Sequence, residues 1–128
     1  MSKHETWRTR KYWETVGGLL IEEFIAVPRS INQGTRLIDA VIVKGHPNKI
    51  HDDNFFDITG QDVICIQTKR NRLGMNLMGQ AFFSRELLKK FSPKSITSVI
   101  ICGKDDIILR DLCQQHNIEV ILIQEIII

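Results

Sequence analysis

The chain has 128 residues, a mass of 14.8 kDa and a formal net charge of +2, with 43% hydrophobic and 25% charged residues. These ordinary values predict one soluble globular domain over residues 1–128, large enough for a single core but not two. No apolar run approaches the roughly 18–20 residues of a membrane span, and the N-terminus is too charged for a signal peptide, so we expect no membrane partner.

Sequence periodicity predicts alternating helices and strands. Aromatic residues at helical spacing predict a first helix over residues 5–16, which Gly17 and Gly18 would end. Apolar runs predict five strands, at residues 19–27, 36–43, 62–69, 95–103 and 118–123. Apolar stripes predict two further helices, at 74–91 and at 105–117, the latter with Asp105 or Asp106 as N-cap. Residues 44–60 are a long polar segment, typical of a functional or mobile loop.

The resulting order is α-β-β-β-α-β-α-β. The last four strands are apolar on both faces, which indicates helices on both sides of the sheet. The fold class is therefore α/β, in layers.

Polar side chains end an otherwise apolar strand in the stretch DVICIQTKR. Period-two alternation puts Gln67 and Lys69 on one face of that strand, and puts Asp39 on an apolar face of strand 36–43. A charge in such a strand is costly unless it is paired or metal-bound. If the two strands are antiparallel neighbours, the three residues converge on one patch. A structural explanation is also open: Lys69 could reach water, and Asp39 could pair with Arg36 or Lys69.

The element order and the segments RLIDAVIV and VICIQTKR resemble the PD-(D/E)xK nuclease superfamily, the restriction-endonuclease-like proteins. The resemblance covers nearly the whole chain, and its best-matched elements are Asp39 and Gln67-Thr68-Lys69. The QxK form is similar to the variant of methyl-directed restriction endonucleases. The resemblance implies a three-layer core with a mixed central sheet flanked by helices, and a metal-dependent DNA endonuclease of restriction or repair type.

The resemblance also implies a role for each matched residue. Asp39 would be the principal Mg²⁺ ligand, with Mn²⁺ as a substitute, while Gln67 would replace the usual acidic ligand and the Thr68 carbonyl would complete the coordination. Lys69 would orient or deprotonate the attacking water and stabilise the transition state. Mg²⁺ prefers hard oxygen ligands and shares its shell with substrate phosphate. Because the Gln67 amide is neutral, the site should hold Mg²⁺ more weakly than a site with a second carboxylate.

The family often has a further glutamate on the first helix. Glu5 fits by its distance before the two glycines, and Glu14 lies nearer the helix end. Glu22 and Glu23 lie on strand 19–27, which a hairpin would bring near Asp39. We favour Glu23 as a catalytic residue, because a charge is hardest to explain on a face that carries Ile21, Ile25 and Val27. Each glutamate could instead be a solvated surface residue.

Several side chains are candidates for DNA contact. Between residues 61 and 94 there are seven lysines and arginines against two acidic residues, so this segment carries +5 and the rest of the chain −3. Such a segment suggests an anionic partner, although a solvated basic face is the commoner meaning. Arg70, Arg72 and Arg85 could bind phosphates. Gln80 matches the helix where some RecB-like relatives carry a glutamine that positions the site or the DNA.

Other motifs are weaker. His46, His51, Asp52 and Asp53 lie in the long loop, but their spacing is not a zinc motif. The cysteines at 65, 102 and 113 form no CxxC pair, and we interpret them as reduced packing residues of a cytoplasmic protein. No GxxxxGK[ST], GxGxxG or GxSxG sequence occurs.

The sequence thus predicts a Mg²⁺-dependent deoxyribonuclease that acts on DNA as a homodimer or with a partner subunit. The isoleucines at 126–128 could dock on the core, join a dimer interface or mark a domain boundary. Two alternatives stay open. One is a non-catalytic nuclease-fold subunit that binds nucleic acid or protein, and the other is an assembly subunit built through the C-terminal isoleucines.

Overall fold

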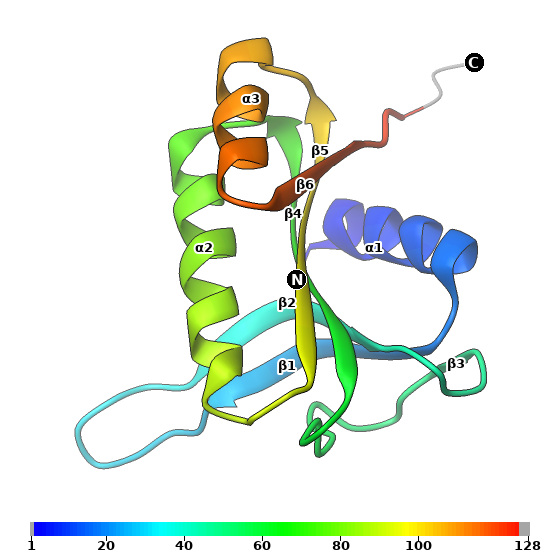
Figure 1. Cartoon of the computed structure of the whole chain (residues 1–128), viewed down its shortest axis with the longest axis vertical. Coiled ribbons are helices and arrows are strands. Elements are labelled where there is room, and N and C mark those ends of the chain that lie inside the picture. The colour runs from blue at the N-terminus through cyan, green and yellow to red at the C-terminus, as the bar shows by residue number, and fades with distance from the viewer. Residues whose placement is uncertain (1, 126–128) are drawn as a thin grey trace.

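One mixed sheet lies between two layers of helices in the computed structural model, which describes residues 2–125 (Figure 1). The elements in chain order are α1 (Lys3–Val16), β1 (Leu19–Val27), β2 (Arg36–Val43), β3 (Lys49–Ile50), β4 (Asp62–Arg72), α2 (Met75–Lys89), β5 (Ser95–Lys104), α3 (Ile107–Gln115) and β6 (Ile118–Leu122). All eight expected elements are present, and the three-layer α/β class is confirmed. The sequence missed β3, and the isoleucines at 126–128 lie outside the described residues.

The sheet joins an antiparallel half to a parallel half, in the order β3-β1-β2-β4-β5-β6. The pairs β1–β2 and β2–β4 are antiparallel, whereas β4–β5 and β5–β6 are parallel. Parallel neighbours need a long crossover, and here α2 and α3 supply the two crossovers. Strands 36–43 and 62–69 are thus antiparallel neighbours, which is the condition for Asp39 to converge with Gln67 and Lys69.

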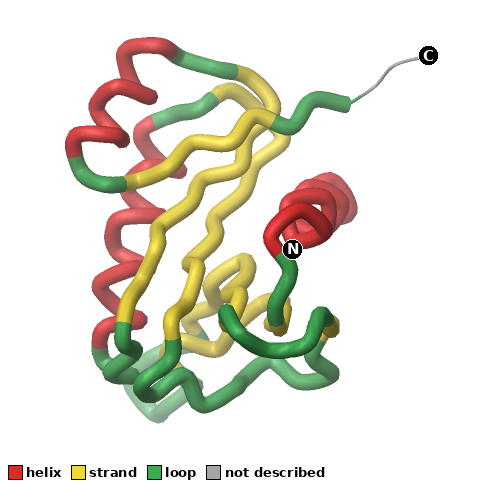
Figure 2. Tube along the Cα trace, turned by 45° about the vertical axis from the view of Figure 1, so that its right-hand side comes forward, coloured by secondary structure: helices red, strands yellow, loops and turns green. Residues whose placement is uncertain are grey.

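Helix α1 covers one face of the sheet, and α2 and α3 cover the other (Figure 2). On the α1 face, Tyr12 and Trp13 pack on a cluster that includes Leu20, Ile42 and Ile66. On the opposite face, α2 buries a stripe of four apolar residues, Leu77, Met78, Ala81 and Leu88. Asp106, not Asp105, is the N-cap of α3, because its side chain accepts a hydrogen bond from the Leu109 amide at 3.0 Å.

The link between α1 and β1 requires glycine. Gly18 has a φ of 92°, and a Cβ built there would lie 2.7 Å from the Val43 carbonyl oxygen. Its amide donates to Asn48 Oδ1 at 2.8 Å, which ties the long 44–60 segment to the start of the sheet. That segment is more ordered than expected, since it forms β3 and buries Ile58 completely. None of the helices in the described residues is long and apolar enough to cross a membrane.

Burial makes a stability prediction for a matched pair of isoleucines. Ile38 in β2 is 1% exposed, whereas Ile31 in the β1–β2 connection is 101% exposed. Ile38→Ala should lower the free energy of unfolding by about 2–5 kcal/mol, because it removes packed methyl groups and leaves a cavity. Ile31→Ala should change it by less than about 0.5 kcal/mol. Urea denaturation of both variants measures the difference, and equal losses would contradict this assignment of the core.

Candidate active site

The candidate residues meet where β2 pairs with β4. The last registered pair towards this end is Ala40 with Ile66, so the next positions are Asp39 and Gln67. Beyond that pair the Thr68 amide donates to Asp39 Oδ2 at 2.9 Å. This bond fixes one carboxylate oxygen of Asp39, and Oδ1 accepts no hydrogen bond from residues 2–125. The structure thus brings together the three residues that the sequence predicts to converge.

Asp39 is partly buried, and burial raises the pKa of its carboxyl group above the ordinary value of 3.8. The Thr68 amide opposes this shift by stabilising the carboxylate. The negative charge of Glu5 raises the pKa further, and the positive charge of Lys69 lowers it. The ionised form of Asp39 is therefore incompletely compensated, and a bound cation would relieve that cost.

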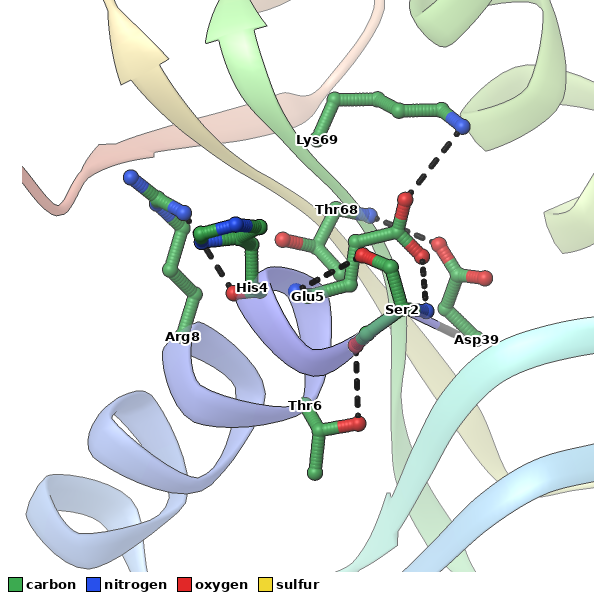
Figure 3. A network of polar contacts seen from close by, with 8 residues as sticks. All are labelled: Ser2, His4, Glu5, Thr6, Arg8, Asp39, Thr68 and Lys69. Carbon is green, nitrogen blue, oxygen red and sulfur yellow. Dashed lines mark hydrogen bonds and ion pairs between the residues drawn. The ribbon is translucent and has the colours of Figure 1, made fainter.

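Glu5 reaches this site from the first turn of α1. Ser2 caps the helix, its hydroxyl accepts from the Glu5 amide at 3.3 Å, and Glu5 Oε2 accepts from the Ser2 amide at 3.2 Å. The other carboxylate oxygen, Oε1, lies 3.4 Å from Lys69 Nζ. Figure 3 shows the Glu5 carboxylate between the Lys69 ammonium group and Asp39. The capping box thus orients an acidic side chain over the ends of β2 and β4.

Gln67 is held by α2. Its side chain is buried, with 5% of the residue exposed, and Nε2 donates to Ser84 Oγ at 2.6 Å. This orientation leaves the amide oxygen as the atom that can accept a water molecule or a cation. The sequence did not indicate this role for Ser84, although its position four residues after Gln80 puts both on one side of α2.

A cavity of about 570 Å³ opens beside these residues, and we call it the Asp39 cavity. Asp39, Gln67, Lys69, Gln80 and Ser84 line it. Its other walls are apolar or charged: Leu37 and Phe83 are exposed there, Arg36 and Lys90 add positive charge, and Glu86 adds a negative charge. Gln80 therefore lies at the site as the sequence predicts, and three cations and two carboxylates among the described residues line the cavity.

Glu23 lies elsewhere, because β1 is irregular at this residue. Its φ is 51°, in the left-handed region. Ile21 and Phe24 pack in the same core cluster although they are three positions apart, whereas residues on one face of a regular strand are two apart. The prediction that Glu23 shares a face with Ile21, Ile25 and Val27 is therefore wrong. Glu23 lines a separate cavity of about 330 Å³ with Glu22, His51, Asp52 and Asp53. Glu22 pairs with Arg10 at 2.8 Å.

The three arginines that the sequence singles out also separate in space. Arg70 and Arg72 follow Lys69 at the end of β4 and line a second cavity. Arg85 points away from both, and its Nη1 donates to the carbonyls of His116 and Asn117 at 3.0 and 3.2 Å. Arg85 therefore caps the C-terminal end of α3.

The donor atoms at the Asp39 cavity fit a hard cation such as Mg²⁺. Asp39 and Gln67 both line this cavity, and Asp39 Oδ1 and the Gln67 amide oxygen are oxygen donors on two paired strands. The described residues contain no group of three or more histidines, cysteines and acidic residues that could hold a metal ion. Because Gln67 contributes a neutral oxygen, protein ligands alone would hold Mg²⁺ weakly, and water or substrate phosphate would supply the remaining oxygens.

The three cysteines are buried packing residues. Cys65 lies two residues before Gln67, and complete burial raises the pKa of its thiol to about 12. The thiol therefore stays protonated at neutral pH and serves as a packing group. Cys102 and Cys113 are buried and free as well.

No family model matches the chain, and no curated protein or solved structure matches it either.

Asp39→Asn should raise the free energy of unfolding at pH 7 in the presence of EDTA. The pKa of Asp39 is higher in the folded than in the unfolded chain, so as the pH rises the unfolded chain loses this proton first. The ionised carboxylate then lowers stability, and it does so fully above the folded-state pKa. Asparagine keeps an oxygen for the Thr68 amide without the charge. The gain should vanish near pH 3, where both states are protonated, as urea denaturation across this range can measure.

Asp52→Asn is the matched control, because the Asp52 side chain is 86% exposed. It should change the free energy of unfolding by less than about 0.5 kcal/mol at either pH. If Asp39→Asn instead lowered stability at pH 7 more than at pH 3, the electrostatic description of Asp39 would be wrong.

Proposed function

We propose that this protein is a metal-dependent nuclease that hydrolyses phosphodiester bonds of DNA, as a restriction- or repair-type endonuclease. One observation carries the proposal. An aspartate, a glutamate, a buried glutamine and a lysine from three separate elements converge at one end of the sheet, beside a cavity whose lining includes Arg36, Lys69 and Lys90. The resemblance of Asp39 and Gln67-Thr68-Lys69 to the PD-(D/E)xK pattern supports the same chemistry.

The proposed cofactor is Mg²⁺, with Mn²⁺ as a substitute, held by Asp39, Gln67 and the Thr68 carbonyl. When bound, such a cation supplies Lewis acidity at a phosphoryl oxygen and lowers the pKa of a coordinated water. Its positive charge would also offset the negative charges of Asp39 and Glu5, whose repulsion raises the Asp39 pKa.

The protein's own groups have distinct proposed roles in hydrolysis. The bond between the attacking water oxygen and phosphorus forms, the bond from phosphorus to the leaving sugar oxygen breaks, and the water proton moves to a base. Glu5, paired with Lys69 at 3.4 Å, is placed to orient the water or accept this proton. Lys69, half-exposed at the cavity edge, would donate to a non-bridging phosphate oxygen and stabilise the growing negative charge.

DNA is the proposed partner, and the basic segment between residues 61 and 94 favours an anionic ligand. Arg36 and Lys90 at the Asp39 cavity, with Arg70 and Arg72 beside it, would bind backbone phosphates. A homodimer or a partner subunit would allow both strands of a duplex to be cut. The free, buried cysteines support the proposed cytoplasmic location.

A second candidate is a non-catalytic nuclease-fold subunit that binds nucleic acid or protein. Two observations favour it: Gln67 is neutral where a carboxylate would strengthen metal binding, and the Lys69 ammonium group is already paired with Glu5. Metal-dependent turnover separates the two candidates.

Lys69→Ala and Asp39→Ala should each lower DNA cleavage by about 100-fold or more, because each removes a charge that acts in the transition state. The assay uses supercoiled plasmid and short linear DNA with Mg²⁺, Mn²⁺ or EDTA. Mg²⁺ should also raise the melting temperature of the wild type but not of Asp39→Ala. Lys44→Ala, an exposed residue at the opposite end of the sheet, should cleave normally. Equal background cleavage by wild type and variants would reject catalysis and favour the binding subunit.

Glu5→Gln and Glu23→Gln test which glutamate serves the site. Glu5→Gln should lower activity by about 10–100-fold, because it removes the negative charge beside Lys69 and Asp39. Glu23→Gln, which makes the same chemical change beside the other cavity, should cleave within about twofold of the wild type. Steady-state cleavage rates across a Mg²⁺ titration measure both, and a larger loss for Glu23→Gln would reverse the assignment.

A further inference from the structure

A second cavity, of about 490 Å³, lies at the end of β4 and β5, and four cations line it. We call it the arginine cavity, and its cations are Arg8, Arg70, Arg72 and Lys104. Among residues 2–125, the one carboxylate in its lining is that of Glu125, whose Oε1 lies 2.8 Å from His4 Nδ1. The lining thus carries a net charge of +3, from four cations and one carboxylate. A concave site with this excess charge attracts a compact anion.

Arg8 is the most unusual residue of this cavity, because it is a buried arginine. It is 2% exposed, its Nε donates to the Ile123 carbonyl at 2.8 Å, and its Nη1 lies 3.3 Å from the His4 carbonyl. Its guanidinium carbon also lies 5.2 Å from the Trp7 ring centre. Within residues 2–125 no carboxylate forms an ion pair with it. The neutral carbonyls of the described residues satisfy hydrogen bonds of Arg8 but do not neutralise its positive charge, and a buried charge without a counter-ion is costly.

An irregularity between β4 and β5 shapes the opening. From Lys69 to Arg72 the chain of β4 advances three residues, while the paired positions on β5, Cys102 and Lys104, are only two residues apart. The extra residue makes a bulge, which redirects side chains at a strand end. Gly103 permits it, because a Cβ there would collide with the Arg70 carbonyl oxygen and lie 3.3 Å from Arg8 Nη2. The bulge therefore brings Arg70 and Arg72 to the cavity that the buried Arg8 also lines.

The other cations have few competing partners. Arg72 Nη1 donates to the Asp105 main-chain carbonyl at 2.7 Å, and the Asp105 carboxylate pairs with Arg110 instead. The side chains of Arg70 and Lys104 make no hydrogen bond or ion pair with the described residues. Three exposed donors thus remain available above one buried guanidinium.

We propose that the arginine cavity binds a terminal phosphate monoester of a DNA strand, at a strand end or a nick. This inference rests on the proposed nuclease function and narrows its substrate. An internal phosphodiester carries one negative charge, whereas a terminal phosphate carries about 1.5–2 at pH 7 and three strong acceptor oxygens. The net charge of +3 around one cavity, with a fork of guanidinium donors, matches the terminal group better.

The position of this cavity relative to Lys69 agrees with such a substrate. Arg70 follows Lys69 directly, and strand residues rise about 3.3 Å each. Lys69 faces Glu5 and the Asp39 cavity, while Arg70 lines the arginine cavity. The two cavities therefore lie on either side of the end of β4. A strand anchored by its terminal phosphate would pass directly over Lys69, so cleavage would occur near the phosphorylated end.

Binding in EDTA tests the inference without hydrolysis. Fluorescence anisotropy compares oligonucleotides of one sequence that carry a 5′-phosphate, a 3′-phosphate or hydroxyls at both ends. One of the two phosphorylated forms should bind about tenfold more tightly than the hydroxyl form, since charge-assisted hydrogen bonds to one phosphate contribute at least this much. The two arms identify the strand end that is recognised. Equal affinity of all three forms would overturn the proposal.

A matched pair of double variants locates the effect. Arg70→Gln with Lys104→Gln should abolish the preference for the phosphorylated form. Lys44→Gln with Lys94→Gln removes the same charge from two exposed lysines at the opposite end of the sheet and should retain it. Thermal denaturation checks that both variants fold. A preference that survives the first pair, or that both pairs lose equally, would also overturn the proposal.

The outcome separates this inference from the nuclease proposal. A phosphate preference without metal-dependent cleavage would support the arginine cavity and reject the nuclease. Metal-dependent cleavage without any phosphate preference would support the nuclease and reject the terminal-phosphate site.

Discussion

The antiparallel pairing of β2 with β4 is the interaction on which the rest of the structure depends. It joins the β1–β2 hairpin to the parallel strands β4, β5 and β6, which would otherwise be two separate sheets. Where the pairing ends, the Thr68 amide turns from the strand ladder to the Asp39 carboxylate at 2.9 Å. The same junction therefore holds the sheet together and orients the acidic residue of the candidate site.

The electrostatics of this junction are finely balanced. Asp39 is partly buried and close to a second negative charge on Glu5, and Lys69 compensates the two carboxylates only in part. Gln67 adds an oxygen but no charge, and its orientation depends on Ser84 of α2. Such a set of donors favours a cation that is shared with an anionic substrate over one bound by protein alone. The excess positive charge of the arginine cavity, on the other side of β4, would attract the same anionic substrate.

Two local departures from regular strand geometry decide which side chains take part. The left-handed conformation of Glu23 shifts the alternation of β1, so that Glu23 lies beside a different cavity. The glutamate near Asp39 is Glu5 of α1. The bulge at the end of β4 separates Arg70 and Arg72 from Lys69 and directs them towards Arg8. Side-chain period-two alternation holds only for a regular strand, so neither departure follows from residue type.

The sequence by itself determined the α/β layers, because strand and helix periodicities are local properties of the chain. It also indicated that Asp39, Gln67 and Lys69 converge, because each is a polar residue on an otherwise apolar strand and the antiparallel pairing of those strands brings them together. Tertiary structure alone decided the rest. The contact of Glu5 with Lys69, the serine that holds Gln67 and the bond from Arg8 to the Ile123 carbonyl all join residues at least 17 positions apart. Periodicity contains no information about such distant partners, because they are selected by how the layers pack together.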